Sequence, residues 1–251
     1  MASRRRTRRS VLLWVCAAAL AALGLFWITL PSAEALRRQN PASTALIEAR
    51  MREARDLGRA PRRNQHWVAL SQISPWLQRA VVNSEDARFW EHEGIDVEQT
   101  KIAITSAVEE GHLGRGASTI TQQLAKNLWL GEERSLWRKT REVLLARRLE
   151  KLGKRRVLEL YLNVAEWGPG IYGADVAARV WFHKPAAELL PEEAAVLAAM
   201  LPAPRRRNPL KPSPYFRKRA RQVLELFSMY QELTPDDLAA ARWRLDALLG
   251  R

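Results

Sequence analysis

Apolar side chains recur at helical spacing along most of this 251-residue chain, and strand-like alternation is scarce. Apolar positions at i, i+3, i+4 and i+7 are typical of a helix that covers a core. The pattern predicts helices over residues 44–56, 97–110, 119–130, 136–152, 154–163, 174–182, 191–201, 214–230 and 235–249. A further helix is expected to begin at Ser74-Pro75, because serine caps helix starts and proline fits the first turn. We therefore expect an all-α domain with one short hairpin at most.

Residues 11–30 contain no charged side chain. A helix of that length rises about 30 Å, which is enough to cross the hydrocarbon core of a bilayer. The alternative is a cleaved signal peptide, for which Ala33-Glu34-Ala35 offers a passable A-x-A site. The apolar region of a signal peptide is normally only about 7–15 residues long. We therefore favour an uncleaved transmembrane anchor.

The five arginines that precede this span are expected to stay in the cytoplasm, because positive charge is retained on that side. The bulk of the chain then lies outside the membrane. The expected division is a basic cytoplasmic tail at 1–10, a transmembrane helix at 11–30, a juxtamembrane helix and linker at 31–64, and the main domain at 65–251. Ser43 is the expected cap of the juxtamembrane helix.

Two polar strings that lie close together are the strongest candidates for a site. The first, Glu85–Asp96, sets a carboxylate beside an aromatic residue and a histidine. The second, Gly116–Asn127, holds hydroxyls, amides and one ammonium group. Burial of so many polar groups is unfavourable unless each finds a partner, so neither string reads as core. A third string, Arg138-Lys139-Thr140-Arg141-Glu142, adds a second carboxylate among three cations.

In order and separation, these strings resemble the motifs of the peptidoglycan glycosyltransferases. They read E-D-x-x-F-x-x-H-x-G-x-D, then G-x-S-T-I-T-Q-Q-x-x-K-N, then R-K-x-x-E. Residues 157–163, followed by three glycines, and residues 194–202 resemble two further family segments. Five ordered motifs are a far more specific signal than one short pattern. The resemblance spans 59–227 and departs at Trp181-Phe182-His183-Lys184, where the family usually has Tyr-Phe-Gly-Lys.

The resemblance implies a lysozyme-like helical fold and a glycosyltransferase domain at 65–251. The implied reaction joins lipid-linked disaccharide-pentapeptide units (lipid II) into a β-1,4 glycan, while undecaprenyl diphosphate leaves. Inversion at the α-linked donor needs one base and a holder for the diphosphate. Fixed cations can stabilise that charge, so no metal is needed in principle, and assistance by a divalent cation stays open. The sequence has no Ser-x-x-Lys or Lys-Thr-Gly motif, so we expect a monofunctional enzyme.

The resemblance also implies a location and partners. We expect a single-pass protein of the bacterial inner membrane whose catalytic domain faces the periplasm. Its partners are then lipid II, the growing glycan strand, membrane lipids, and cell-wall or division proteins. The net charge of +14 would also suit nucleic acid. However, the expected topology and the lack of a nucleic-acid motif argue against that partner, and anionic headgroups and a diphosphate fit better. The cations at 217–221 read partly as ordinary surface.

Glu85 matches the first glutamate of the family's first segment, and we interpret it as the base. Phe89, one helical turn further on, offers an apolar wall that raises the pKa of a carboxyl group. Asp86 is expected to orient its neighbours. His92 would share the helix face of Glu85 if the helix continued, and a structural or hydrogen-bonding role is favoured for it. The alternative for Glu85 is an ordinary surface glutamate at a helix end.

Thr119, Gln123 and Lys126 follow i, i+4 and i+7 spacing and therefore share one face of the predicted helix, with Asn127 beside them. By resemblance, these four residues and Ser118 line the substrate cleft, with Lys126 against the diphosphate. The alternative is a solvated helix face.

Arg138 and Glu142 lie at i and i+4, which by itself indicates a surface ion pair worth roughly 0.2–0.5 kcal/mol. By resemblance, Glu142 is the second important acid, on the donor side or orienting the cations. Arg138 and Lys139 would then stabilise the leaving diphosphate, where a planar guanidinium suits paired oxygens. Neighbouring cations favour the ionised form of Glu142, so Glu85 is the better candidate for the base. The fourth segment adds three weaker candidates: Tyr161, Asn163 and Glu166.

Three alternatives stay open at this point. Residues 97–110, with Ile102, Ile104 and Val108, form either a membrane-facing flap or part of the core. The enzyme rival is an anchored lysozyme-like hydrolase or lytic transglycosylase. Its reaction releases no diphosphate, so it has no need of the cations at Lys126, Arg138 and Lys139. The non-enzymatic rival is an anchored scaffold that binds glycan or division proteins.

Overall fold

The computed structural model describes residues 14, 17, 24, 26–110, 118–131 and 135–250, and most of them are helical. The α-helices are α2 (Ala45–Asp56), α3 (Pro75–Glu85), α4 (Val97–Glu110), α5 (Ile120–Ala125), α6 (Leu136–Glu150), α7 (Lys154–Val164), α8 (Ala174–Phe182), α9 (Pro191–Met200), α10 (Pro214–Met229) and α11 (Pro235–Leu249). Four short helical segments are η1 (Glu34–Arg37), η2 (Leu70–Gln72), η3 (Lys126–Leu130) and η4 (Ala186–Glu188). The mainly helical prediction is confirmed, and a lysozyme-like domain agrees with it.

Helix starts follow the capping signals of the sequence. The side chains of Ser74, Ser213 and Thr234 each accept a hydrogen bond from a first-turn amide, and proline follows each of them. One cap was predicted wrongly, because Thr44 rather than Ser43 accepts the amide of the first turn of α2. Ser43 instead donates to the carboxylate of Glu48, 2.5 Å away. A serine and a threonine stand side by side here, and either type caps well.

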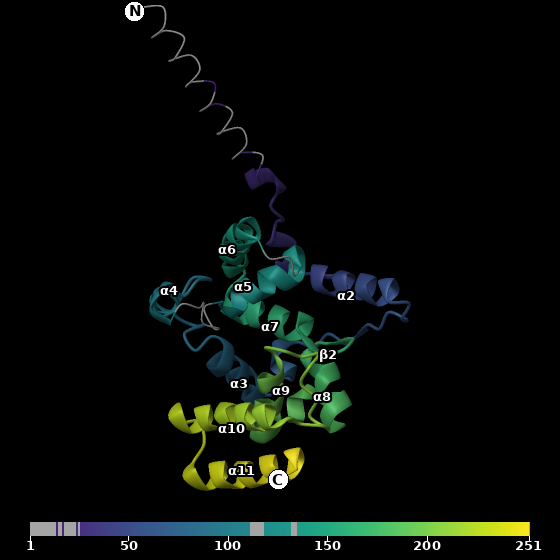
Figure 1. Cartoon of the computed structure of the whole chain (residues 1–251), viewed down its shortest axis with the longest axis vertical. Coiled ribbons are helices and arrows are strands. Elements are labelled where there is room, and N and C mark those ends of the chain that lie inside the picture. Colours follow the sequence, from purple (N-terminus) through teal and green to yellow (C-terminus); the bar gives the residue numbers. More distant parts are fainter. Residues whose placement is uncertain are drawn as a thin grey trace, which may run out of the picture.

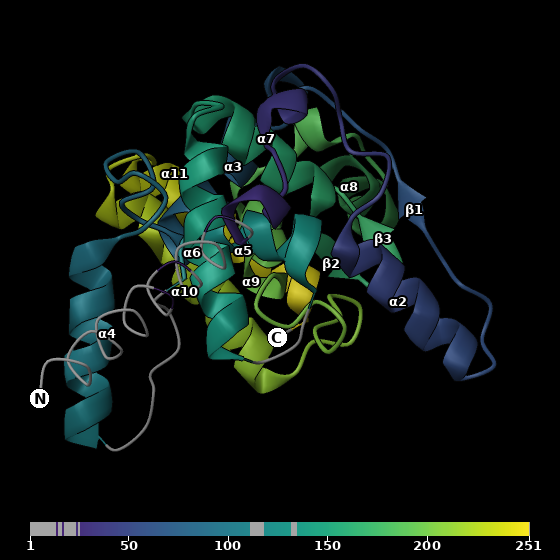
Figure 2. The same ribbon diagram turned by 90° about the horizontal axis from the view of Figure 1, so that it is seen from above.

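Helix α9 is the centre of the core, because every one of its residues is buried. Apart from Glu192 and Glu193 in its first turn, its residues are apolar, and a helix of that kind is stable only inside a protein. Helices α3 and α10 pack against α9, and α11 packs on α10. Helix α5 packs between α6 and α7. Figure 1 shows α10 and α11 together at one end of the molecule, and Figures 1 and 2 show α2 and α4 on opposite sides.

A small sheet with strand order β1-β3-β2 adds to the helices. Strands β2 (Glu166–Gly168) and β3 (Ile171–Tyr172) form the expected hairpin, and β1 (Asn64–Gln65) pairs with β3 in parallel. Strand β1 was not predicted, because a strand of two residues is too short to show an alternation of apolar and polar side chains. Gly170 has φ +74°, and a Cβ there would lie 2.7 Å from the Cβ of Arg62. The hairpin and the segment before β1 are therefore in close contact.

The segment that follows the predicted span packs on the domain. Leu30, Ala33 and Leu36 belong to the main core. Arg148 Nη1 donates to the carbonyl of Leu30 at 2.7 Å. Most of residues 11–30 lie outside the described part of the chain, and no helix within that part is long and apolar enough to span a bilayer. The predicted anchor and domain boundaries stay predictions.

Helix α4 stands to one side of the other helices in both views (Figures 1 and 2). Val97 and Ile102 are 55% and 56% exposed, so these side chains form apolar surface rather than core. The side chains of Ile104 and Val108 lie outside the described residues. Contact of this surface with a membrane stays a prediction.

Candidate active site

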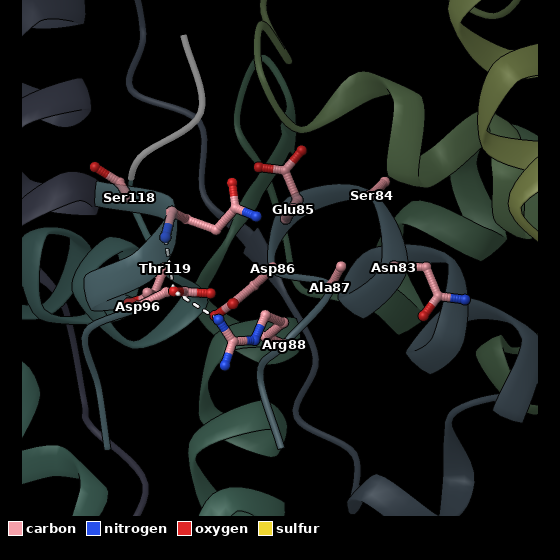
Figure 3. A pocket seen from close by; sticks show the side chains of 10 residues that line it. Asn83, Ser84, Glu85, Asp86, Ala87, Arg88, Asp96, Ser118 and Thr119 are labelled. Carbon is pink, nitrogen blue, oxygen red and sulfur yellow. Dashed lines mark hydrogen bonds and ion pairs between the residues drawn. The ribbon is translucent and has the colours of Figure 1, made fainter. Parts of the chain in front are cut away.

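Three adjoining cavities lie beside the end of α3, and we call them together the cleft. The first has about 190 Å³ and the second about 430 Å³, and Glu85 and Ser118 line both of them. The third has about 140 Å³ and shares Gln123 and Pro202 with the second. Figure 3 shows the first cavity, with Glu85 and Ser118 at its edge. The second alone falls within the roughly 300–1,000 Å³ of small-molecule sites.

Glu85, the last residue of α3, is partly buried at the junction of these cavities. Its Oε2 accepts a hydrogen bond from Gln123 Nε2 at 3.0 Å. Gln123 Oε1 in turn accepts one from the Tyr161 hydroxyl at 2.8 Å. Burial raises the pKa of the Glu85 carboxyl, against the opposing effects of the Gln123 hydrogen bond and of Arg219 and Arg207. A carboxylate with a raised pKa that faces a cavity is suited to accept a proton.

The apolar wall expected from Phe89 needs correction, whereas the hydrogen-bonding role favoured for His92 agrees with its contacts. Helix α3 ends at Glu85, and Asp86 has φ −162° and ψ 70°, so His92 does not share a helix face with Glu85. Phe89 is fully buried and packs on Trp90 with a centroid distance of 5.0 Å. Phe89 lies outside the residues that line the cleft, and the main cause of the raised pKa of Glu85 is its burial as a whole.

Asp86 joins the first polar string to the second. Its Oδ2 accepts the backbone amide of Ile120 at 2.9 Å, and its Oδ1 lies 2.9 Å from His92 Nε2. The amide of Gly94 donates to His92 Nδ1, which leaves the proton on Nε2, where it is donated to Asp86. Figure 3 shows the carboxylates of Glu85 and Asp86 pointing in different directions. Asp86 and His92 therefore position the backbone around Glu85.

The helix predicted over 119–130 runs without a gap from Ile120 to Leu130, but its hydrogen-bond pattern changes on the way. Thr119 is the N-cap of α5, which ends at Ala125, and η3 continues with π-helical hydrogen bonds. Such a widened turn is frequent at functional sites. It places Gln123, Lys126 and Asn127 along the third cavity. The structure therefore brings these side chains together as predicted, whereas Thr119 lines the first cavity.

The third string is a cluster of charges around the buried carboxylate of Glu142. Arg138 Nη1 lies 2.6 Å from one oxygen of Glu142, and Lys139 Nζ lies 2.5 Å from the other. Lys139 Nζ also donates to Ser118 Oγ at 3.0 Å, which connects the cluster to the cleft wall. The Glu142 side chain is only 5% exposed, so the pair is not the weak surface pair that its spacing alone suggests. Removing one partner from a buried pair typically costs about 3–5 kcal/mol.

Arg138 also carries an unused donor. Its Nε is buried and has no hydrogen-bond partner within the described part of the chain. Buried N–H groups nearly always find an acceptor, and a guanidinium suits oxyanions that accept two bonds at once. An anionic substrate group is one acceptor that would satisfy this atom.

One wall of the cleft was missed by the sequence analysis. Tyr215, Arg219 and Gln222 of α10 line the second cavity together with Arg207. The Arg207 guanidinium lies 5.4 Å from the centre of the Tyr215 ring. The i, i+4, i+7 spacing on α10 was the available signal, but the basic run around Arg219 resembles an ordinary solvated surface.

The weaker candidates of the fourth segment divide into two kinds. Tyr161 contacts Gln123 and lines the cleft. Asn163 exchanges hydrogen bonds with the backbone of Val68, at 3.0 and 2.9 Å, and therefore supports the fold. Glu166 also lines the cleft, where it is buried and pairs with Arg50 at 3.0 Å.

Comparison with known proteins agrees with this geometry. The family model described as Transglycosylase matches residues 53–228, which include the cleft and the cluster of charges around Glu142. The chain therefore belongs to the transglycosylase family.

Three similar proteins carry the same name. The chain is 41% identical over 186 residues to a biosynthetic peptidoglycan transglycosylase of Nitrosospira multiformis, covering 74% of this chain and 81% of the relative. It is 44% identical over 208 residues to the protein of that name from Rhodospirillum centenum, covering 82% and 87%. A third, from Thiobacillus denitrificans, is 48% identical over 167 residues, covering 66% and 72%. The enzyme is accordingly a peptidoglycan glycosyltransferase.

Proposed function

We propose that this enzyme polymerises lipid II into β-1,4 glycan strands and releases undecaprenyl diphosphate, by an inverting transfer in which Glu85 is the general base. The observation that carries the proposal is the carboxylate of Glu85, partly buried at the junction of the cleft with a raised pKa. An inverting displacement needs one base in such a position to accept the proton of the attacking hydroxyl.

Charge stabilisation of the leaving group is the second part of the proposal. Lys126 lines the cleft. Arg138 does not itself line the three cavities, but its buried Nε has no partner among the described residues, and an oxyanion that reached it would satisfy this donor. Lys139 holds both Ser118 and Glu142, so the proposed role of Glu142 is to orient the two cations beside it. Preorganised cations stabilise a developing negative charge without a metal ion. The proposed reaction therefore requires no metal, and assistance by a divalent cation stays open.

We further propose that the enzyme is a single-pass protein of the bacterial inner membrane with its catalytic domain on the periplasmic side. A substrate with a lipid tail is available only at a membrane surface. Membrane lipids and cell-wall or division proteins are the proposed partners beyond the substrate. The uncharged residues 11–30 and the arginines before them support this location.

The function is tested directly with purified enzyme and lipid II. We expect polymeric glycan that lysozyme digests, together with released undecaprenyl diphosphate. Release of new reducing ends from finished glycan, without polymer formation, would support the hydrolase instead. Binding of glycan with neither product would support the scaffold.

The pH dependence of polymerisation should report on Glu85. Because its pKa is raised, we expect the acidic limb of the kcat/KM profile to lie above the ordinary glutamate value of about 4.3. Gln123→Leu removes a hydrogen bond that lowers this pKa, so the limb should move to still higher pH. Gln222→Leu, an amide on α10 in the same cavity, serves as the control and should leave the limb in place. A limb that moves down in Gln123→Leu would contradict the assignment.

A separate prediction concerns the proposed membrane anchor. Cleavage after Ala35 would remove Leu30 and Ala33, which are 4% and 5% exposed, from the core that they help to cover. We therefore expect the mature protein to keep residues 1–30 and to resist carbonate extraction from membranes. Sequencing of the mature N-terminus is the measurement, and a terminus at Leu36 would refute the anchor.

A further inference from the structure

A fourth cavity, of about 400 Å³, lies between α2 and the β2–β3 hairpin. One part of its wall is apolar and comes from Ala54, Leu57 and Pro169. The rest is rich in arginine, and the buried hydroxyl of Tyr172, which has no hydrogen-bond partner within the described residues, belongs to the same wall. A cavity that combines small apolar side chains, cations and an unused polar group is built to accept a polar ligand.

The charges of this cavity do not balance. Arg205 forms two hydrogen bonds with Glu53, at 2.8 and 2.9 Å. Arg50 is paired with Glu166 at 3.0 Å. Arg59 and Arg62 also line the cavity, and no carboxylate of the described chain forms an ion pair with either.

The position of the two uncompensated arginines is defined by the fold. The amide of Asn64 donates to the carbonyl of Gly170 at 2.8 Å, and β1 pairs with β3 directly after Arg62. The backbone of Arg59 donates to the carbonyl of Ala54 in the last turn of α2. Both arginines are thus exposed residues of the cavity wall whose segments are held by backbone hydrogen bonds.

The cavity continues the cleft. Arg50 and Glu166 line both this cavity and the one that Lys126 and Gln123 line. A ligand that extends from Glu85 past Lys126 therefore reaches the Arg50–Glu166 pair and then the arginine-rich wall. The glycan strand of the proposed reaction carries a peptide on every disaccharide, so a peptide side branch is the part of the substrate that would enter here.

We propose that this cavity binds the carboxylate-bearing peptide of the glycan strand, with Arg59 and Arg62 on its carboxylates and the apolar wall against its apolar side chains. The proposal rests on the proposed function and names a further subsite of the substrate. Charge-assisted hydrogen bonds from guanidinium to carboxylate are among the strongest in proteins, and they discriminate an acid from an amide.

The test compares two substrates on the full-length enzyme. One is lipid II with its free peptide carboxylates, and the other is the same lipid with these carboxylates amidated. We expect the unaltered enzyme to use the acidic substrate with a kcat/KM about tenfold higher, the size of one charge-assisted contact. In the double variant Arg59→Gln/Arg62→Gln the two substrates should become equal within about twofold.

The matched control removes the same charge from the same part of the chain. Arg52 and Arg55 are exposed on α2 outside the cavity, so Arg52→Gln/Arg55→Gln should retain the preference for the acidic peptide. An unaltered enzyme without any preference would overturn the proposal, as would a preference that survives in Arg59→Gln/Arg62→Gln. A loss that occurs with both substrates, and only in vesicles containing phosphatidylglycerol, would assign the arginines to lipid headgroups instead. Failure of the proposed function is distinct, since neither substrate would then give polymer.

Discussion

Replacing Glu85 with glutamine is expected to abolish glycan polymerisation while lipid II still binds. Glutamine keeps the shape of the side chain but cannot accept the proton of the attacking hydroxyl. Loss of a general base typically lowers the rate by about 10²–10⁴-fold. Polymer formation and lipid II binding, measured on the same preparation, separate loss of chemistry from loss of affinity.

Two comparisons make this experiment decisive. Glu91→Gln alters an exposed carboxylate six residues away in the same string and should keep full activity. Glu142→Gln should also be impaired, but with a larger share of the loss in binding, because it releases Arg138 and Lys139 from their shared partner. Substantial polymer from Glu85→Gln would overturn the mechanism.

The second large effect is expected at the cations. Lys126→Ala and Arg138→Ala should each lower polymerisation by about 10²–10³-fold, the usual effect of losing one preorganised donor to a developing negative charge. The loss should appear mainly in kcat, because negative charge builds up on the leaving oxygen in the transition state. Single-turnover rates of diphosphate release are the most direct measurement.

Arg138 also stabilises buried Glu142, so its variant needs a control for folding. Lys139 still pairs with Glu142 in Arg138→Ala, and the thermal midpoint shows whether the domain remains folded. Arg147→Ala removes an exposed cation from the same helix and should have no effect on polymerisation. Normal polymerisation by the Lys126→Ala/Arg138→Ala double variant would rule out the assignment of these cations.

The helices and much of the candidate site could be predicted from the sequence because their signals are local. Ser74-Pro75 marks the start of α3, and the apolar stripe through Leu77 and Val81 leads to Glu85 at its end. The ranges 97–110, 174–182 and 235–249 agree with the observed helices residue by residue. Gln123, Lys126 and Asn127 were expected to lie together, and the structure brings them to one cavity.

The remaining features depend on contacts between distant segments. The sequence left open whether the helix continues to His92, and α3 in fact ends at Glu85, where Asp86 bonds the start of α5. The π-helical turn after Ala125 carries no distinct sequence signal. Arg219 looks like one more surface cation, and only the packing of α10 against α3 brings it to Glu85. These features depend on tertiary packing, which the helix propensity of a local segment does not reveal.

The hydrogen-bonded row from Tyr161 through Gln123 to Glu85 makes substrate binding and proton affinity interdependent. Burial raises the pKa of Tyr161, so its phenol stays protonated. The phenol donates to Gln123 Oε1, and this hydrogen bond leaves the NH₂ group of Gln123 facing Glu85. A sugar that takes this amide as its own hydrogen-bond donor releases Glu85 from it and strengthens the carboxylate as a base. By thermodynamic reciprocity, protonation of Glu85 must then change the affinity for that sugar by the same factor. In the proposed mechanism the base is thus partly restrained in the free enzyme, and a sugar bound to the Gln123 amide would strengthen it.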